Sequence, residues 1–237
     1  MLAGARDLLR ERFVGMYLHG SLATGDFAPE RSDIDFLVVT DDELPDDVVA
    51  ALGEMHARLA SSGERWVAHL EGSYIPRAAM RRYDASAAQH PRLPIGEPFR
   101  IAHHRADWVI QRHVLREQGV VLAGPAPRTF IDPVTKAQLR AAVVELLHGF
   151  WARQLVAGDF LRPREYQAFA VLTMCRALYT LECGGMVSKP AAARWAMANL
   201  VAPWPGVIAR ALTWPHGEQP DGLDETLALI RYTLERA

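Results

Sequence analysis

The chain has 237 residues, half of them hydrophobic, and its 28 acidic and 26 basic side chains leave a formal net charge of -2. This balance excludes a disordered chain, which would need fewer apolar residues and more unbalanced charge, and it suits one large domain or two small ones. Every apolar run is interrupted before it reaches the roughly 20 residues that a membrane helix requires. The N-terminal segment has acidic residues and no long apolar stretch, and the chain has only two cysteines, so we expect a cytoplasmic protein without a signal peptide.

The charge is unevenly distributed along the sequence. Residues 26–54 contain ten acidic side chains and one arginine, a local charge of -9, which leaves +7 for the rest of the chain. We interpret Asp41, Asp42, Asp46 and Asp47 as residues that solvate a loop or interact with a helix dipole. The sequence has no basic stripe, so nucleic acid is not an expected partner.

The first part of the chain has the pattern of a mixed α/β core. Apolar residues recur at helical spacing over residues 2–12, and an apolar run at 13–20 predicts a buried strand. After a turn-rich loop, residues 33–40 are β-branched and aromatic and predict a second strand. Residues 45–59 have helical spacing, and alternation at 65–76 predicts a third strand.

The middle of the chain is less regular. Residues 77–105 are rich in proline, histidine and arginine without a clear period, and we expect a long loop-bearing segment there. Helical spacing returns over residues 106–119. Residues 120–133 contain three prolines, which favour a connection between two domains.

The rest of the sequence is predominantly helical in pattern. A glycine pair at 184–185 predicts a helix end, and Ser188, with a proline two residues later, predicts a helix start. The predicted helices cover residues 134–156, 165–182, 190–199 and 223–236. We therefore predict an α+β protein, with a domain built on a mixed sheet at residues 1–131 and an all-α helical bundle at residues 132–237.

The strongest functional signal is a Gly-Ser turn followed by two aspartates. Gly20 and Ser21 follow the first strand, and such a turn brings backbone N–H groups and a hydroxyl close to a phosphate. Asp33 and Asp35 are two residues apart on the next strand, so their carboxylates share a face. Two close carboxylates repel unless a hard cation such as Mg²⁺ binds them. The alternative is the solvated face of an amphipathic strand.

A two-carboxylate site needs a group that accepts the proton of an attacking hydroxyl. Glu71 is the best candidate, because it lies in the predicted third strand within an apolar segment. An exposed strand position is the alternative reading of Glu71, and Asp84 is a weaker substitute for it.

At these motifs the chain resembles the streptomycin/spectinomycin adenylyltransferase group of the polymerase-β-like nucleotidyltransferase superfamily. Three segments are similar to motifs of that group: LHGSLATGDFAPERSDIDFLVV, HLEGSYI and LTMCRALYTLECGGMVSKPAAARWA. The resemblance covers nearly the whole chain. It implies an N-terminal nucleotidyltransferase domain and a C-terminal helical bundle, with ATP and an aminocyclitol acceptor in the cleft between them.

The resemblance also implies roles for individual residues. Next to the phosphate-binding turn at Gly20, it assigns Ser21 and Ser32 to the triphosphate. It assigns Asp33 and Asp35 to Mg²⁺ and gives Glu71 the role of the base. Arg176 and Lys189 are assigned to the ATP phosphates. The expected reaction is transfer of AMP to a hydroxyl of a small aminoglycoside or aminocyclitol, with release of pyrophosphate. The alternatives are another small molecule, a protein or an RNA end as acceptor, or a catalytically silent nucleotide-binding module.

The acceptor site is the least determined part. Trp151 matches a tryptophan that stacks on streptomycin in the group, although a core position is the alternative. Asp159 and Glu165 are candidate replacements for the group's acidic acceptor residues. These matches leave streptomycin, spectinomycin, another aminoglycoside or an unrelated hydroxyl compound open.

Two further residue sets have a structural interpretation. Four histidines occur at positions 90, 103, 104 and 113, but no cysteine or glutamate stands at zinc-ligand spacing beside them, so we do not expect zinc there. Cys175 and Cys183 accompany an apolar helical stretch and are expected to be buried thiols.

Overall fold

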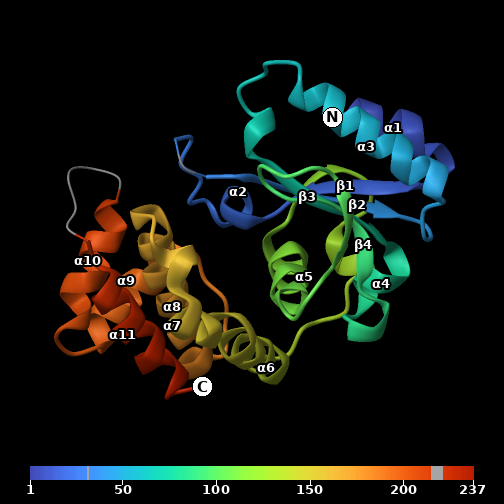
Figure 1. Ribbon diagram of the computed structural model, residues 1–237. Coiled ribbons are helices and arrows are strands. Elements are labelled where there is room, and N and C mark those ends of the chain that lie inside the picture. The colour runs from blue at the N-terminus through green and yellow to red at the C-terminus, as the bar shows by residue number, and fades with distance from the viewer. Residues whose placement is uncertain (31, 215–220) are drawn as a thin grey trace. The chain divides into compact units, whose positions relative to one another are not determined.

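The computed structural model describes residues 1–30, 32–214 and 221–237. The chain forms two compact units, Met1–Val134 and Thr135–Ala237 (Figure 1). Among the described residues, no helix combines the length and the apolar character needed to cross a membrane.

The first unit is built on a six-stranded sheet with the order β5-β4-β3-β2-β1-β6. Its strands are β1 (Phe13–Leu18), β2 (Ile34–Thr40), β3 (Leu70–Pro76), β4 (Gln89–Leu93), β5 (Arg100–His103) and β6 (Val120–Ala123). The central strands β2 and β3 are parallel, and the other neighbouring pairs are antiparallel. The sheet is therefore mixed, as the sequence predicts.

Helices cover both faces of this sheet (Figure 1). Successive side chains of a strand point to opposite sides, so each central strand has an apolar surface on both faces. Phe36 and Val38 of β2 pack with α1 (Leu2–Leu9) and α3 (Asp46–Ala60). Leu37 and Val39 face the other way and pack with α4 (Arg77–Arg81) and α5 (Asp107–Gln118). The chemistry-bearing residues of β2 and β3 thus stand at the rim of a well-filled core.

In the second unit, all the regular structure within residues 135–214 and 221–237 is helical. Its elements are α6 (Lys136–Leu146), a π-helical turn (Leu147–Trp151), α7 (Ala152–Ala157), α8 (Arg164–Cys183), α9 (Lys189–Asn199), α10 (Trp204–Thr213) and α11 (Leu223–Leu234). The long helix α8 packs against α9, α10 and α11. Gly184 ends α8 in the left-handed conformation and Ser188 caps α9, as predicted.

The structure corrects the prediction for residues 77–105. This segment contains α4, β4 and β5 rather than a long loop. Both strands are short, with the sequences QHPRL and RIAH, and neither has the alternating pattern that identifies a strand in a sequence. In β4, Pro91 also argues against a strand. Pairing with β3 and with each other supplies their hydrogen bonds.

Two more boundaries in the first unit differ from the prediction. Part of the segment 120–133 forms β6, which pairs with β1, so this segment belongs to the sheet as well as to the connection. The strand predicted over residues 65–76 begins only at Leu70, after the 3₁₀ turn Val67–His69.

The second unit also departs from the prediction. Helix α10 lies between two predicted helices, where the sequence predicts none. Pro203, Pro205 and Gly206 surround its start, and proline is tolerated in the first turn of a helix. The π-helical turn divides the helix predicted over residues 134–156. Cys175 is buried as expected, but Cys183 is exposed, because it lies at the end of α8.

Candidate functional site

The Gly-Ser turn and the aspartate strand contact each other directly. Gly20 begins the short helix α2 (Gly20–Thr24) in a left-handed conformation, with φ of 59°. A Cβ at position 20 would overlap the carboxylate of Asp35. The backbone N–H of His19 donates to the carbonyl oxygen of Asp35 at 3.0 Å. Glycine is therefore needed here for both its backbone conformation and the close approach of the carboxylate.

The three predicted carboxylates lie at the same end of the sheet. Asp35 and Glu71 are direct partners in the parallel pairing of β2 with β3. Asp33 immediately precedes β2, and its Oδ1 is 3.9 Å from Nδ1 of His69. The sheet therefore brings together acids that are 38 residues apart in the sequence, at the amino ends of its two parallel strands.

Glu71 has a partner that the sequence analysis missed. Nη2 of Arg92 on β4 donates to Oε1 of Glu71, and both side chains are about three-quarters buried. Arg92 stands opposite Ser73 on the antiparallel neighbour of β3, so it reaches Glu71 diagonally on the same face. No spacing rule in the sequence indicates this pair, because it depends on the register of a strand that was not predicted.

A buried histidine, His19, lies close to these carboxylates. Burial lowers the pKa of His19 to about 4, although Glu71 opposes this effect, so the ring is neutral at pH 7. Gln111 of α5 interacts with this ring, and Nδ1 of His19 has no hydrogen-bond partner in the described part of the chain. A neutral, buried imidazole therefore lies close enough to the Glu71 carboxylate to interact with it.

The two predicted serine ligands occupy different local structures. Ser21 lies in α2, and its carbonyl oxygen accepts from the backbone N–H of Asp26 at 3.1 Å. The hydroxyl of Ser32 accepts from the backbone N–H of Ala28 at 2.9 Å, which closes the loop before Asp33. Ser32 therefore orders the approach to β2 in addition to standing next to the first aspartate.

The donor set of this end of the sheet suits a hard cation. Carboxylate oxygens of Asp33 and Asp35 are ligands that Mg²⁺ accepts, and the Gly20 turn leaves the space that the Asp35 carboxylate occupies. The described residues contain no group of three His, Cys, Asp or Glu side chains arranged to hold a metal. Two carboxylates with substrate phosphate oxygens completing the coordination match the usual Mg²⁺ arrangement.

The second unit places its two predicted cationic residues on neighbouring helices. Arg176 lies on α8, and Lys189 is the first residue of α9. Nζ of Lys189 is 4.0 Å from the ring centre of Phe169, a cation–π contact. Phe169 precedes Arg176 by two helical turns and therefore shares its face of α8. Phe169 was not predicted as part of the site.

The predicted acceptor residues differ in exposure. Trp151 is 6% exposed, and its ring packs with Phe150, Phe160 and Phe169. Phe169 is 38% exposed, so it is the more accessible ring of this aromatic cluster. Asp159 is exposed and pairs with Arg162 at 2.7 Å.

The two substitutes considered from the sequence lie at helix starts. Glu165 is exposed in the first turn of α8. Asp84 accepts from the backbone N–H of Ser86 and begins a 3₁₀ turn. Asp84 follows α4, beyond the carboxyl end of β3, whereas Glu71 lies near its amino end.

Comparison with known proteins agrees with this geometry. Residues 2–83 match the family model of the nucleotidyltransferase domain, and residues 129–236 match that of the aminoglycoside adenylyltransferase C-terminal domain. The aminoglycoside (3'') (9) adenylyltransferase of Escherichia coli is 29% identical over 224 residues, which cover 91% of this chain and 82% of the relative. The spectinomycin 9-adenylyltransferase of Campylobacter jejuni is 23% identical, and the match covers 96% of this chain and 89% of that protein.

A solved structure has the same fold. The spectinomycin adenyltransferase AAD(9) from Enterococcus faecialis, crystallised with ATP and spectinomycin, matches with a TM-score of 0.75. The match covers 99% of this chain and 95% of that one, at 18% sequence identity. Together, the two consecutive family models and the relatives confirm the resemblance in the motifs: the chain combines a nucleotidyltransferase domain with a C-terminal domain of the aminoglycoside adenylyltransferase type.

Proposed function

We propose that this protein transfers AMP from ATP to a hydroxyl group of an aminoglycoside or aminocyclitol and releases pyrophosphate. The observation that carries the proposal is the packing of the Asp35 carboxylate against Gly20, directly beside Glu71 on the neighbouring strand. The turn proposed to bind phosphate, the carboxylate proposed to bind the metal and the candidate base therefore lie at one end of the sheet. The relatives named as aminoglycoside and spectinomycin adenylyltransferases support the choice of acceptor class.

In this proposal, the residues of the first unit bind the triphosphate and activate the acceptor. Asp33 and Asp35 would hold Mg²⁺, which when bound neutralises charge on the phosphate oxygens. Gly20 and Ser21 supply backbone and hydroxyl donors to the triphosphate, and Ser32 contributes a further hydroxyl. Glu71 accepts the proton of the acceptor hydroxyl.

The bond changes follow from these roles. The acceptor oxygen forms a bond to the α-phosphorus of ATP, and its proton moves to the Glu71 carboxylate. The bond between the α-phosphorus and the bridging oxygen breaks, and that oxygen leaves with pyrophosphate. Arg176 and Lys189 provide the positive charge that stabilises the leaving pyrophosphate.

The acceptor contacts are proposed for the helical unit. Trp151 is the residue matched to the acceptor site, and Asp159 is a candidate replacement for an acidic acceptor residue. Phe169 offers an accessible ring beside Trp151. An accessible aromatic face is suited to an amine-bearing ring compound, because a cation is attracted to the face of the ring. Spectinomycin and streptomycin are therefore the first compounds to test.

The test is an acceptor panel assayed with ATP and Mg²⁺. We expect pyrophosphate release with at least one aminoglycoside or with spectinomycin, and mass spectrometry of that compound should detect the addition of one AMP. ATP binding without release for every compound would contradict the proposal and favour a silent nucleotide-binding module. Release without modification of any antibiotic, but with AMP on a different molecule, would instead identify another acceptor.

A further inference from the structure

The first unit contains a pocket at the opposite end of its parallel strands. The pocket has a volume of about 440 Å³, which lies in the range of small-molecule sites. Asp42 and Glu43, which follow the carboxyl end of β2, line it. Asp35 stands seven residues earlier on this strand, and at about 3.3 Å per residue the pocket lies roughly 20 Å from the candidate active site. The proposed nucleotidyl transfer does not use this pocket.

Unpaired polar atoms are concentrated around the pocket. Five buried side-chain nitrogen atoms of the described residues have no hydrogen-bond partner, and three belong to residues that line it: His90, His104 and Trp108. Each of these three residues is more than nine-tenths buried. Leaving buried polar atoms unpaired costs stability, so their accumulation beside a pocket of this size indicates a site shaped for a ligand.

The positions of Glu43 and His90 show which kind of ligand group this side of the pocket can bind. Oε1 of Glu43 is 3.8 Å from Nδ1 of His90, which is too long for a direct hydrogen bond. Burial lowers the pKa of His90, so the ring is neutral at pH 7 and the contact is not an ion pair. A carboxylate oxygen and an unpaired ring nitrogen at this separation can both accept from one donor group between them.

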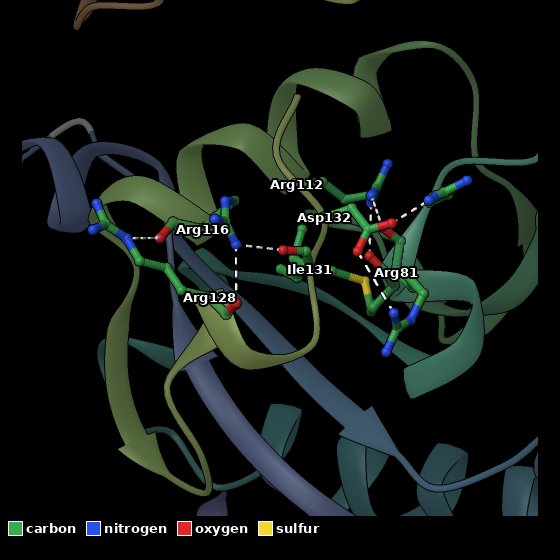
Figure 2. A network of polar contacts seen from close by, with 8 residues as sticks. Arg81, Arg112, Arg116, Arg128, Ile131 and Asp132 are labelled. Atoms are coloured by element: carbon green, nitrogen blue, oxygen red, sulfur yellow. Dashed lines mark hydrogen bonds and ion pairs between the residues drawn. The ribbon is translucent and has the colours of Figure 1, made fainter. Parts of the chain in front are cut away.

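The arginines of the pocket are already engaged. Arg81 and Arg82 both pair with Asp132, at 3.7 and 2.6 Å, and Arg112 donates to the carbonyl oxygens of Met80 and Arg81. Figure 2 shows Arg81 and Arg112 directed into this network around Asp132.

The acidic side chains of the pocket have no such partners. Asp42, Glu43 and Asp84 lie further than 4.0 Å from every lysine and arginine in the described ranges 1–30, 32–214 and 221–237. Four carboxylates, those of Asp42, Glu43, Asp84 and the arginine partner Asp132, stand against three guanidinium groups, so the net charge around the pocket is negative.

We propose that this pocket is a second small-molecule site that binds an organic cation. A primary ammonium group lies between Glu43 and His90 and donates to both. The apolar part of the ligand packs on the aromatic and aliphatic floor, formed by Trp108, Ile75 and Met80. The ligand class is thus an amine with a compact hydrophobic body, and its binding requires neither ATP nor the catalytic carboxylates.

Three probes of similar size test the charge requirement: benzylamine, benzyl alcohol and benzoate. Binding to the full chain is measured by calorimetry, and the location is read from the indole N–H resonance of Trp108, assigned with W108F. We expect benzylamine to bind at least about tenfold more tightly than either of the other probes and to shift this resonance. Equal binding of benzylamine and benzyl alcohol, preferred binding of benzoate, or no benzylamine binding would overturn the proposal.

Matched variants test the location. E43Q keeps the side-chain shape at an exposed position and should weaken benzylamine binding about tenfold or more. E97Q removes a carboxylate of the same unit that pairs with Arg100 outside the pocket, and it should leave binding unchanged. D35N should also leave it unchanged. An unaltered affinity in E43Q, or a loss in D35N, would assign the amine to another site.

Discussion

The guanidinium of Arg92 contacts the carboxylate of Glu71 across the neighbouring strands β3 and β4. The proposed base is therefore held by a charged partner on a second strand, and its position depends on the register of that pair. A hydrogen bond from a guanidinium to a carboxylate fixes the direction of the carboxylate more firmly than a neutral donor does.

Replacement of Arg92 tests this relationship. In Arg92→Met, we expect kcat to fall about tenfold, a loss of about 1.4 kcal/mol in transition-state stabilisation, with little change in the KM for ATP. Arg92→Lys should retain more activity, because it keeps a donor at this position. The reduction should disappear in an E71Q background, since two residues that act through one interaction have non-additive effects.

The control for this variant is Arg77→Met. Arg77 pairs with Asp41 at 2.7 Å, and both of these side chains are more than half exposed. This pair belongs to the opposite end of the sheet, so its loss should leave kcat unchanged. A similar decrease in both variants would mean that Arg92 acts through general stability.

Substitution of Gly20 should damage the site through the backbone. Gly20→Ala places a side chain at a positive φ and against the Asp35 carboxylate, so we expect a destabilisation of about 1–3 kcal/mol and loss of turnover. Gly25→Ala is the matched control, because Gly25 also has a positive φ but no atom within 4 Å of the added Cβ. Urea unfolding of both variants should give the smaller loss for Gly25→Ala; equal losses would show that the carboxylate contact contributes nothing.

The paired aspartates should be needed for chemistry and not for folding. Asp33→Asn and Asp35→Asn should each reduce turnover at least about 100-fold, because the carboxylates proposed to hold Mg²⁺ are lost. Circular dichroism and the thermal transition should be close to those of the original chain. Asp41→Asn, at the other end of β2, is the control and should retain full turnover. Undiminished activity of either active-site variant would contradict the proposed mechanism.

The two lysines of the chain allow a direct comparison. Lys189→Met should raise the KM for ATP about tenfold, because it removes a cation proposed to contact the phosphates. Lys136 lies in the first turn of α6 and packs against Gly184, and Lys136→Met should leave the KM for ATP unchanged. Equal KM values for the two variants would remove Lys189 from the proposed site.

Acid should destabilise the first unit through its buried histidines. Burial lowers the pKa of His56 to about 4, below the ordinary value near 6.5. The unfolded chain therefore binds a proton that the folded chain does not, and stability falls as the pH decreases from about 6.5 to about 4. His56→Gln, which can still pair with the Tyr74 hydroxyl, should reduce the slope of unfolding free energy against pH over this interval. An unchanged slope would contradict the assignment.

The sequence by itself determined the local framework of the candidate site. The β-branched and aromatic content of β2 and the Gly-Ser turn before it are properties of short segments, and they place Asp33 and Asp35 on one face without reference to the rest of the chain. The helix boundaries around Gly184 and Ser188 follow from backbone preference and capping, which are also local. The motifs of these segments were sufficient to indicate the resemblance that the comparisons confirm.

Only the tertiary structure decided which distant residues meet. The Arg92–Glu71 contact depends on the pairing of β4 with β3, and the pocket at Glu43 and His90 depends on the same sheet together with α5. Short strands and proline-rich helix starts have no strong local signal, because their stability comes from pairing and packing rather than from residue preference. For this reason, the sequence located the proposed metal-binding carboxylates, whereas the partner of the proposed base and the second pocket emerged only from the folded chain.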